Sequence, residues 1–368
     1  MSKGNLIKHF SPAWFAAIMG TGGLANVLYL WGNLWSPGHL LGIFFAWLNA
    51  VLYILFLIPW LGRWLSHFEQ LKQDLRHPIM GNFFVTMPVG TVILATNAAL
   101  MGTSFLGHPF VYVFSWIAWI IGMLGALILG VYVTLNSLIS EQTPPQVLNF
   151  AWLITPVASI VVPLIGNPLT AMLKQSAPSI APVVLLLNLS FYGIGFFLFL
   201  FIGAVVLTRL IQHPLPPAAM TPTFWILLGP IGVGTLSLMG LADSAKSLGF
   251  LTSIDTAYLL AAIFWGLGFW GLGVALSLSL RYLKQGGIPF SLSWWAFIFP
   301  LGAYTMASFK LASYFSSSLI YWYTGLLTLL LVVLWALTFI RTLGGVANGK
   351  LFQPQPHPQP QPSTVSLT

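Results

Sequence analysis

The chain contains no cysteine, and only five of its 368 residues are acidic. The lack of cysteine excludes disulfides, thiolate metal sites and a cysteine nucleophile. Charged residues of both signs make up 5% of the sequence, against about 25% in soluble domains, whereas hydrophobic residues make up 58%. Because so few polar side chains cannot cover a surface in water, the composition predicts an integral membrane protein.

The hydrophobic residues occur in long continuous runs, which are typical of membrane helices and differ from the short alternating segments of a β-barrel. We therefore expect an all-α fold with ten transmembrane helices. The runs cover residues 11–32, 39–61, 83–102, 109–138, 149–166, 181–210, 223–242, 256–283, 290–314 and 318–342.

Three regions follow from these runs. Residues 1–10 form the N-terminal segment, residues 11–345 form the ten-helix transmembrane domain, and residues 346–368 form a Pro/Gln-rich tail. The tail contains the stretch QPQPHPQPQP, whose low complexity predicts disorder of the polyproline type.

The positive charges indicate the orientation. Ten spans place both termini on one side of the membrane, and that side receives all but three of the 13 lysines and arginines. The exceptions are Lys174, Lys246 and Lys310. Because cytoplasmic loops are enriched in lysine and arginine, both termini are predicted to lie in the cytoplasm, with the chain in the plasma (inner) membrane. The net charge of +8 is therefore a topology signal and does not indicate nucleic-acid binding.

A short pattern recurs in the odd-numbered spans, in which Pro or Gly is followed two residues later by Gly or Ala. It reads Gly20-Thr21-Gly22, Pro88-Val89-Gly90, Pro156-Val157-Ala158, Pro230-Ile231-Gly232 and Pro300-Leu301-Gly302, at intervals of about 70 residues. The chain is therefore predicted to form five helical hairpins, each with one interrupted and one continuous helix.

Interrupted backbone at membrane depth is tolerated only inside protein or beside water, because a freed carbonyl needs a partner. The five interrupted helices are thus expected to cluster around a central pore, in a quasi-fivefold arrangement. The alternative is that proline and glycine here only permit close packing of membrane helices.

The charges along this pore would favour anions or neutral solutes. The acidic residues, Glu69, Asp74, Glu141, Asp243 and Asp255, fall in loops or at span ends, whereas a cation pathway usually carries carboxylates along its wall. Backbone N–H groups and nearby hydroxyls would bind the anion, unless the hydroxyls bond their own helix. The candidate pore-lining and anion-binding residues are Gly20, Thr21, Gly22, Pro88, Gly90, Thr91, Pro156, Ser159, Pro230, Gly232, Thr235, Pro300, Gly302, Thr305 and Lys310.

Two side chains in the ninth span have specific possible roles. Lys310 follows Pro300 by about 15 Å of helix, which places it near the outer mouth. There it would either attract anions or extend to the membrane interface. Phe299, just before the break, would either plug the pore or pack in the bundle.

The remaining residue types predict neither a metal site nor a catalytic centre. The histidines in and between the spans are not paired at ligand spacing, and no nucleophile or carboxylate pair falls in the membrane. We therefore expect no cofactor and no enzymatic activity. A membrane scaffold would not need five regularly spaced helix breaks.

Four stretches carry a family resemblance: FSPAWFAAIMGTGGLANVL, HPIMGNFFVTMPVGT, PLPPAAMTPTFWILLGPIGVGT and WWAFIFPLGAYTMASFKLA. They resemble the tellurite-resistance/dicarboxylate transporter family, which includes TehA-type proteins, malate permeases, sulfite pumps and plant slow anion channels. The resemblance covers roughly residues 8–345. It implies ten helices in five hairpins, quasi-fivefold about a pore, in a homotrimer with one pore per subunit.

The resemblance also implies that the aromatic residue of the FPLG stretch, Phe299, gates the pore. The chain departs from the TehA type by keeping proline in four of the five inner helices, and its ninth span is closer to the malate, sulfite and plant channel branch. The expected function is channel-like or weakly coupled transport of small anions. The alternative is a proton-coupled C4-dicarboxylate (malate) carrier or a sulfite or tellurite exporter. The expected partners are the anion and the lipid bilayer.

Overall fold

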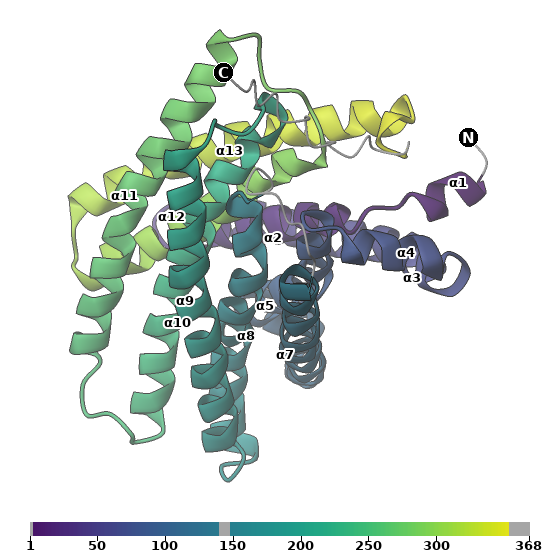
Figure 1. Cartoon of the computed structure of the whole chain (residues 1–368). Helices are drawn as coiled ribbons and strands as arrows, with labels where there is room; N and C mark the ends of the chain where they lie inside the picture. Colours follow the sequence, from purple (N-terminus) through teal and green to yellow (C-terminus); the bar gives the residue numbers. More distant parts are fainter. Residues whose placement is uncertain (1–2, 140–147, 353–368) are drawn as a thin grey trace.

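The computed structural model describes residues 3–139 and 148–352, and these residues form helices joined by short connections (Figure 1). The described residues contain no β-strand. The predicted all-α fold is therefore confirmed. Glu141 lies outside the described residues.

Five helices follow the recurring pattern of the sequence and are called the inner helices. They are α2 (Phe15–Trp31), α5 (Thr86–Asn97), α8 (Ile154–Ser176), α10 (Leu228–Ser247) and α12 (Ile298–Tyr314). Each follows a short 3-10 helix, namely η1 (Pro12–Trp14), η2 (Met80–Val85), η5 (Phe150–Leu153), η6 (Ala218–Leu227) and η7 (Leu292–Phe297). A π-helical turn, η3 (Ala98–Gly102), joins α5 to α6 (Thr103–Leu106).

Five longer helices alternate with the inner ones along the chain and are called the outer helices. They are α3 (Pro37–Ser66), α7 (His108–Ile139), α9 (Ala181–Gln212), α11 (Asp255–Lys284) and α13 (Ser318–Ala347). Each packs against the inner helix that precedes it, which gives the five predicted helix pairs. At 1.5 Å per residue these helices are about 45 Å long, enough to cross a bilayer.

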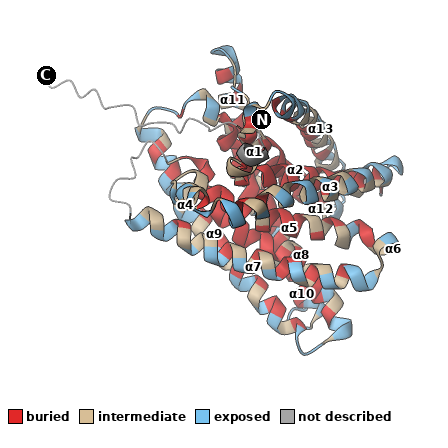
Figure 2. Ribbon diagram, turned by 90° about the vertical axis from the view of Figure 1, so that its right-hand side faces the viewer, coloured by how far each residue is buried: buried red, intermediate tan, exposed pale blue. Residues whose placement is uncertain are grey.

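The inner helices form a closed ring. Going round it, α2 contacts α5, α5 contacts α8, α8 contacts α10, α10 contacts α12, and α12 contacts α2. In the most apolar 18-residue stretch of each of the first four inner spans, 72% to 83% of the residues are buried. In the corresponding stretches of the outer helices, 17% to 33% of the residues are buried. In α12, 13 of 17 residues are buried. Figure 2 shows the buried residues gathered in the middle of the bundle, with exposed residues along the outer helices.

Among the described residues, nine helices are long and apolar enough to cross a membrane. The tenth expected span, 290–314, corresponds to η7 and α12, where the α-helix has 17 residues and carries Lys310. The span expected at 149–166 is longer than predicted, because α8 continues to Ser176 through Pro163 and Pro168. The count of ten spans and the fivefold relation between hairpins stay predictions.

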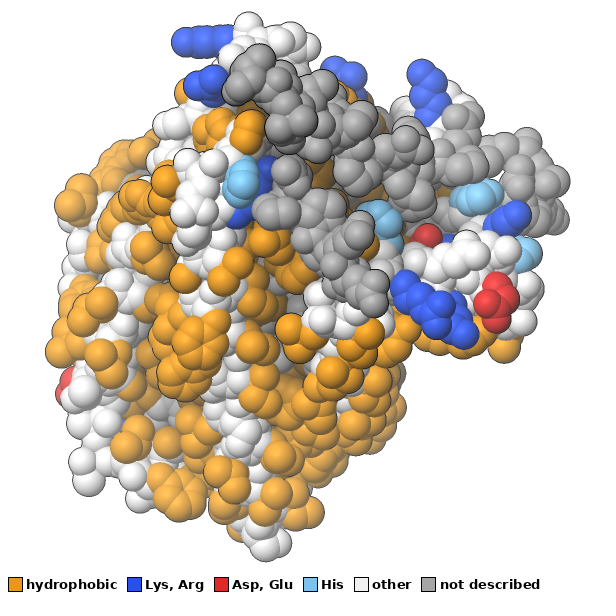
Figure 3. All heavy atoms as spheres, viewed as in Figure 1, with side chains coloured by type: hydrophobic (Ala, Val, Ile, Leu, Met, Phe, Trp, Pro, Cys, Tyr) orange, Lys and Arg blue, Asp and Glu red, His pale blue; other side chains and the backbone are white. Residues whose placement is uncertain are grey.

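The outer surface is apolar over most of its extent. Large exposed hydrophobic side chains are spread along all five outer helices, for example Ile58, Ile128, Phe201, Ile263 and Leu329. Figure 3 shows this apolar surface, with lysines and arginines gathered along its upper and right edges. Because such a surface is stable against acyl chains and not in water, the chain is a multi-pass membrane protein.

The C-terminal end of the described chain packs against its N-terminal part. The ring of Phe352 stacks on that of Trp14 at 5.6 Å between centroids, and the neighbouring Leu351 is buried. Helix α13 continues to Ala347, and η8 (Lys350–Phe352) packs against the core through Leu351, while the tail boundary at 346 stays a prediction. The rest of the predicted tail lies outside the described residues.

A short amphipathic helix, α4 (Phe68–Arg76), follows α3 and packs against α3 and η2, while α1 (Lys3–Lys8) packs against α3. Its Asp74 accepts a hydrogen bond of 2.6 Å from the buried guanidinium of Arg63, which also donates to the carbonyl of Phe10 at 2.9 Å. Arg63 of α3 thus connects helix α4 to the N-terminal part of the chain.

Candidate functional site

The helix interruptions predicted from proline are junctions between 3-10 and α-helix. Pro88, Pro156, Pro230 and Pro300 are each the third residue of an inner α-helix. Proline fits the first turn well, because the N–H groups there have no partner within the α-helix. The expected mid-helix bends with freed carbonyls are therefore absent at these four prolines.

The first inner helix differs from the other four. Gly20, Thr21 and Gly22 lie within the continuous helix α2, so the interruption expected there is also absent. A Cβ added to Gly22 would lie 2.5 Å from the side chain of Ile93 and 2.6 Å from that of Asn49. Gly22 thus permits a close approach between α2 and its neighbours.

Two other candidate glycines also lie at tight helix contacts. A Cβ at Gly232 would lie 2.3 Å from the backbone nitrogen of Tyr304, and a Cβ at Gly20 would lie 3.0 Å from Trp295. A Cβ added to Gly90 or Gly302 would have its nearest neighbouring atom at 3.4 Å or 3.6 Å, which is an ordinary contact distance. Close packing of the ring therefore accounts for Gly20, Gly22 and Gly232.

The candidate hydroxyls are all buried. Thr91, Thr235 and Thr305 each donate to the carbonyl four residues earlier in their own helix, at 3.0, 2.8 and 2.7 Å. Thr21 accepts a hydrogen bond of 3.1 Å from the indole of Trp335 in the outer helix α13. Ser159 is buried in α8. Four of the five hydroxyls therefore bond to the helices themselves.

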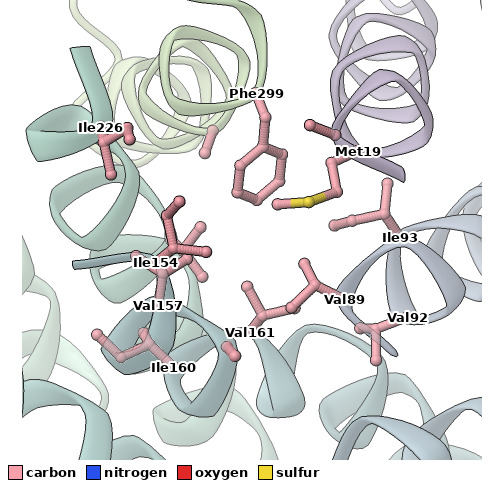
Figure 4. Packing of buried hydrophobic residues seen from close by; sticks show 14 of the residues in the cluster. Met19, Val89, Val92, Ile93, Ile154, Val157, Ile160, Val161, Ile226 and Phe299 are labelled. Carbon is pink, nitrogen blue, oxygen red and sulfur yellow. The ribbon is translucent and has the colours of Figure 1, made fainter. Parts of the chain in front are cut away.

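Phe299 lies in the middle of the ring. Its side chain points inward beside Met19, with Ile154 and Val157 across from it (Figure 4). The residue is 5% exposed and borders a small cavity of about 40 Å³. Side chains from all five inner segments line this inner cavity, which lies near the start of the inner α-helices: Ala16, Met19, Phe83, Thr86, Ile154, Val157, Ile226, Gly229, Trp295, Ala296, Phe299 and Pro300.

The inner cavity is almost wholly apolar. Its one hydroxyl, on Thr86, donates to the carbonyls of Pro12 and Phe83 at 2.8 and 2.6 Å. None of its lining residues is charged. An apolar constriction of this kind opposes the passage of ions by excluding water.

A larger cavity of about 680 Å³, called here the vestibule, opens between the C-terminal halves of the same helices. Its lining residues include Asn33, Thr96, Asn167, Asp243, Ser244, Ser247, Met306, Lys310 and Ser313. The two cavities are separated by about 10 Å of inner helix, as judged from the roughly seven residues between their linings. Val89 and Val161, which Figure 4 shows close together, fall in sequence between the two linings.

Gly23 also falls in sequence between the two linings, and the sequence analysis missed it. It is buried, yet a Cβ added to it would meet no atom within 4 Å. Gly23 therefore faces unfilled space inside the ring. It is the last glycine of the stretch MGTGG, one residue beyond the pattern used to select Gly20 and Gly22.

Lys310 lines the vestibule, and it has a partner that the sequence did not reveal. Its Nζ donates to Oδ2 of Asp243 at 2.8 Å, and the hydroxyl of Tyr258 donates to Oδ1 of the same carboxylate at 2.7 Å. The two charged residues are 67 positions apart in the chain. The charge of Lys310 is therefore paired.

Of the candidate site residues, Phe299 and Pro300 line the inner cavity and Lys310 lines the vestibule. The other candidates line neither of these two cavities and lie buried in the walls of the ring. No cluster of three or more histidine or acidic side chains with the spacing of a metal site occurs within the described residues.

These features define a class of protein. Five inner helices enclose two axial cavities, which a layer of apolar side chains separates, and five outer helices cover the ring with a surface suited to lipid. This arrangement is that of a membrane protein with a closed central passage.

The comparison with known families gives the particular class. The profile of the SLAC1 family, described as voltage-dependent anion channels, matches residues 9–343. The chain belongs to this family of anion channels and transporters. The predicted resemblance to the tellurite-resistance/dicarboxylate transporter family is thereby confirmed.

Three relatives illustrate the range of the family. An uncharacterized transporter of Methanocaldococcus jannaschii is 35% identical over 353 residues, which cover 96% of this chain and 98% of the relative. A sulfite efflux pump of Trichophyton rubrum is 26% identical, with 94% and 93% covered. A putative malic acid transport protein of Schizosaccharomyces pombe is 25% identical, with 96% and 84% covered.

Proposed function

We propose that the chain carries small anions across the plasma membrane through the passage inside the inner ring, in a channel-like or weakly coupled manner, with Phe299 as the gate. The observation that carries this proposal is the pair of axial cavities with Phe299 beside the closed layer between them. Moving this one ring would widen the inner cavity, which is the small apolar part of the passage.

The choice of anions rests on the charges along the passage. The inner cavity has no charged lining residue, and the vestibule has one carboxylate, which is paired with a lysine. A pathway for cations would instead need unpaired carboxylates along its wall. The family match points in the same direction.

The substrate class follows from the named relatives. One is called a sulfite efflux pump and another a putative malic acid transport protein, and both names refer to small oxyanions. We therefore propose small anions such as these as substrates. The second candidate, a proton-coupled carrier for C4-dicarboxylates or an exporter of sulfite or tellurite, uses the same passage with a coupled proton.

The orientation and assembly are part of the proposal. Both termini lie in the cytoplasm, because Phe352 packs on Trp14 at the side that carries most of the lysines and arginines. The vestibule then opens to the outside. The family resemblance favours a homotrimer with one passage per subunit, and we propose no enzymatic role and no bound cofactor.

Reconstitution into liposomes tests the proposal. We expect flux of chloride, nitrate, sulfite or malate above that of protein-free vesicles, and a membrane potential that follows the anion gradient. Flux that requires a proton gradient, even for the permanently charged nitrate ion, would favour the coupled carrier. Vesicles that contain folded protein and pass none of these anions would refute transport.

A further inference from the structure

The ion pair between Lys310 and Asp243 has an unusual position in the vestibule. The two side chains are 33% and 44% exposed, so both remain in contact with the space that an anion must cross. Within the part of the chain that the structure describes, they are the only charged residues lining this cavity. The residues that line the vestibule therefore carry no net formal charge, and a further lysine, Lys174, lies beside them and donates to Ser247 at 3.2 Å.

Both oxygens of the Asp243 carboxylate accept hydrogen bonds. Asp243 accepts from Lys310 through Oδ2 and from Tyr258 through Oδ1, and the Lys310 ammonium also lies 5.5 Å from the centre of the Tyr258 ring. The Tyr258 hydroxyl would keep Asp243 in place when Lys310 turns to another partner. A lysine ammonium has three donors, of which Asp243 takes one here.

Donors for an anion lie close to this pair. Ser247 is one helical turn after Asp243 in α10, and Ser313 is one turn after Lys310 in α12, so each serine shares a helix face with a member of the pair. Both serines line the vestibule, as does Asn167 of α8. Within the vestibule lining, Lys310 thus has neutral hydrogen-bonding neighbours and a single negative competitor, while Lys174 donates to Ser247 from outside the lining.

We propose that Lys310 is the outer binding group for the transported anion and that Asp243 is a built-in competitor, which the incoming anion displaces. This inference rests on the proposed function. A carboxylate is chemically similar to a small oxyanion, so both bind the same ammonium donors. Exposed ion pairs are weak and exchange readily, which makes displacement possible.

The competition gives the passage a useful property. A conducting site must bind its ion well enough to admit it and weakly enough to release it. An unpaired lysine in the vestibule would hold an anion more tightly. Asp243 weakens that binding, because it takes the place of the departing ion.

The test is the variant Asp243→Asn, which preserves the shape of the side chain and removes its charge. We measure the chloride and nitrate concentrations that give half-maximal flux in liposomes of neutral phosphatidylcholine, at fixed ionic strength with a large impermeant anion. A carboxylate about 4 Å from the site in a water-like medium changes anion affinity by about fivefold. We expect the half-saturating concentration to fall by about fivefold.

A matched control distinguishes two effects of Asp243→Asn, namely the loss of the competitor for Lys310 and the loss of one negative charge on this side of the protein. Asp255 lies on the same side, at the start of α11, accepts hydrogen bonds from Ser253 and Tyr314, and does not line the vestibule. Asp255→Asn removes the same charge and is expected to leave half-saturation nearly unchanged. Lys310→Met is expected to raise half-saturation, because it removes the ammonium that binds the anion.

The outcomes are distinguishable. Wild-type protein that passes no anion refutes the proposed function. Wild-type flux with half-saturation unaltered by Asp243→Asn, or altered equally by Asp255→Asn, overturns the competition and leaves transport standing. If Asp243→Asn fails to fold, Asp243→Ser removes the same charge and decides the same question.

Discussion

Replacing Phe299 by alanine is the most informative perturbation of this protein. The ring borders the inner cavity, and its neighbours around the axis are Met19, Ile154 and Val157. To open the passage, the ring must leave this packed position for a wetter one. Phe299→Ala removes that step, because a methyl group cannot fill the same space.

The size of the effect follows from the burial of the ring. Phe299 is 5% exposed, and burying a phenylalanine side chain contributes about 1.5–3 kcal/mol relative to exposing it. If this free energy favours the closed state, its loss raises the open fraction by about 10- to 100-fold, since 1.4 kcal/mol corresponds to a factor of ten. Anion flux in liposomes, or current in planar bilayers, should rise by a similar factor.

Phe297→Ala is the control. Phe297 is also 5% exposed and packs edge-on against Trp225 and Trp294, away from the inner cavity. Each alanine variant is expected to lose about 3–5 kcal/mol of folding stability, but only Phe299→Ala should increase flux. Unchanged flux in folded Phe299→Ala protein, or an equal increase in Phe297→Ala, would refute the gating role.

Two further predictions concern stability in detergent. Gly232→Ala places a Cβ against the backbone of Tyr304, so we expect a loss of about 1–3 kcal/mol, whereas Gly266→Ala meets no atom within 4 Å and should gain about 0.5–1 kcal/mol. Equal unfolding midpoints for the two variants would contradict this account. Asp74→Asn leaves the buried guanidinium of Arg63 without its carboxylate, so we expect a loss of about 3 kcal/mol in chemical unfolding. An unaltered midpoint would show that this ion pair contributes nothing to stability.

The sequence predicted the fold class and the alternation of inner and outer helices well. Long apolar runs with few charges determine where a chain can cross a membrane, because lipid provides no hydrogen bonds to polar groups. The recurring Pro or Gly pattern correctly marked the helices of the ring. Its physical meaning was different, since the four prolines begin α-helices and do not bend them in the middle.

Individual site residues were harder to predict. Glycine suits both a pore wall and a tight helix contact, and only the positions of neighbours such as Asn49 and Tyr304 assign Gly22 and Gly232 to contacts. The sequence did not reveal Gly23 either, because only the positions of neighbouring atoms show that it faces unfilled space. The inward direction of Phe299 depends on the rotation of α12 about its axis, which the packing of the whole ring determines.

Composition and periodicity alone determined that this chain is a helical membrane protein with repeated helix pairs, because local hydrophobicity governs insertion into lipid. Which side chains meet on the axis, and that Lys310 faces Asp243 across 67 residues of sequence, was decided only when α10 and α12 packed side by side. Contacts between distant segments depend on the geometry of the assembled ring, and no local pattern in the sequence encodes that geometry.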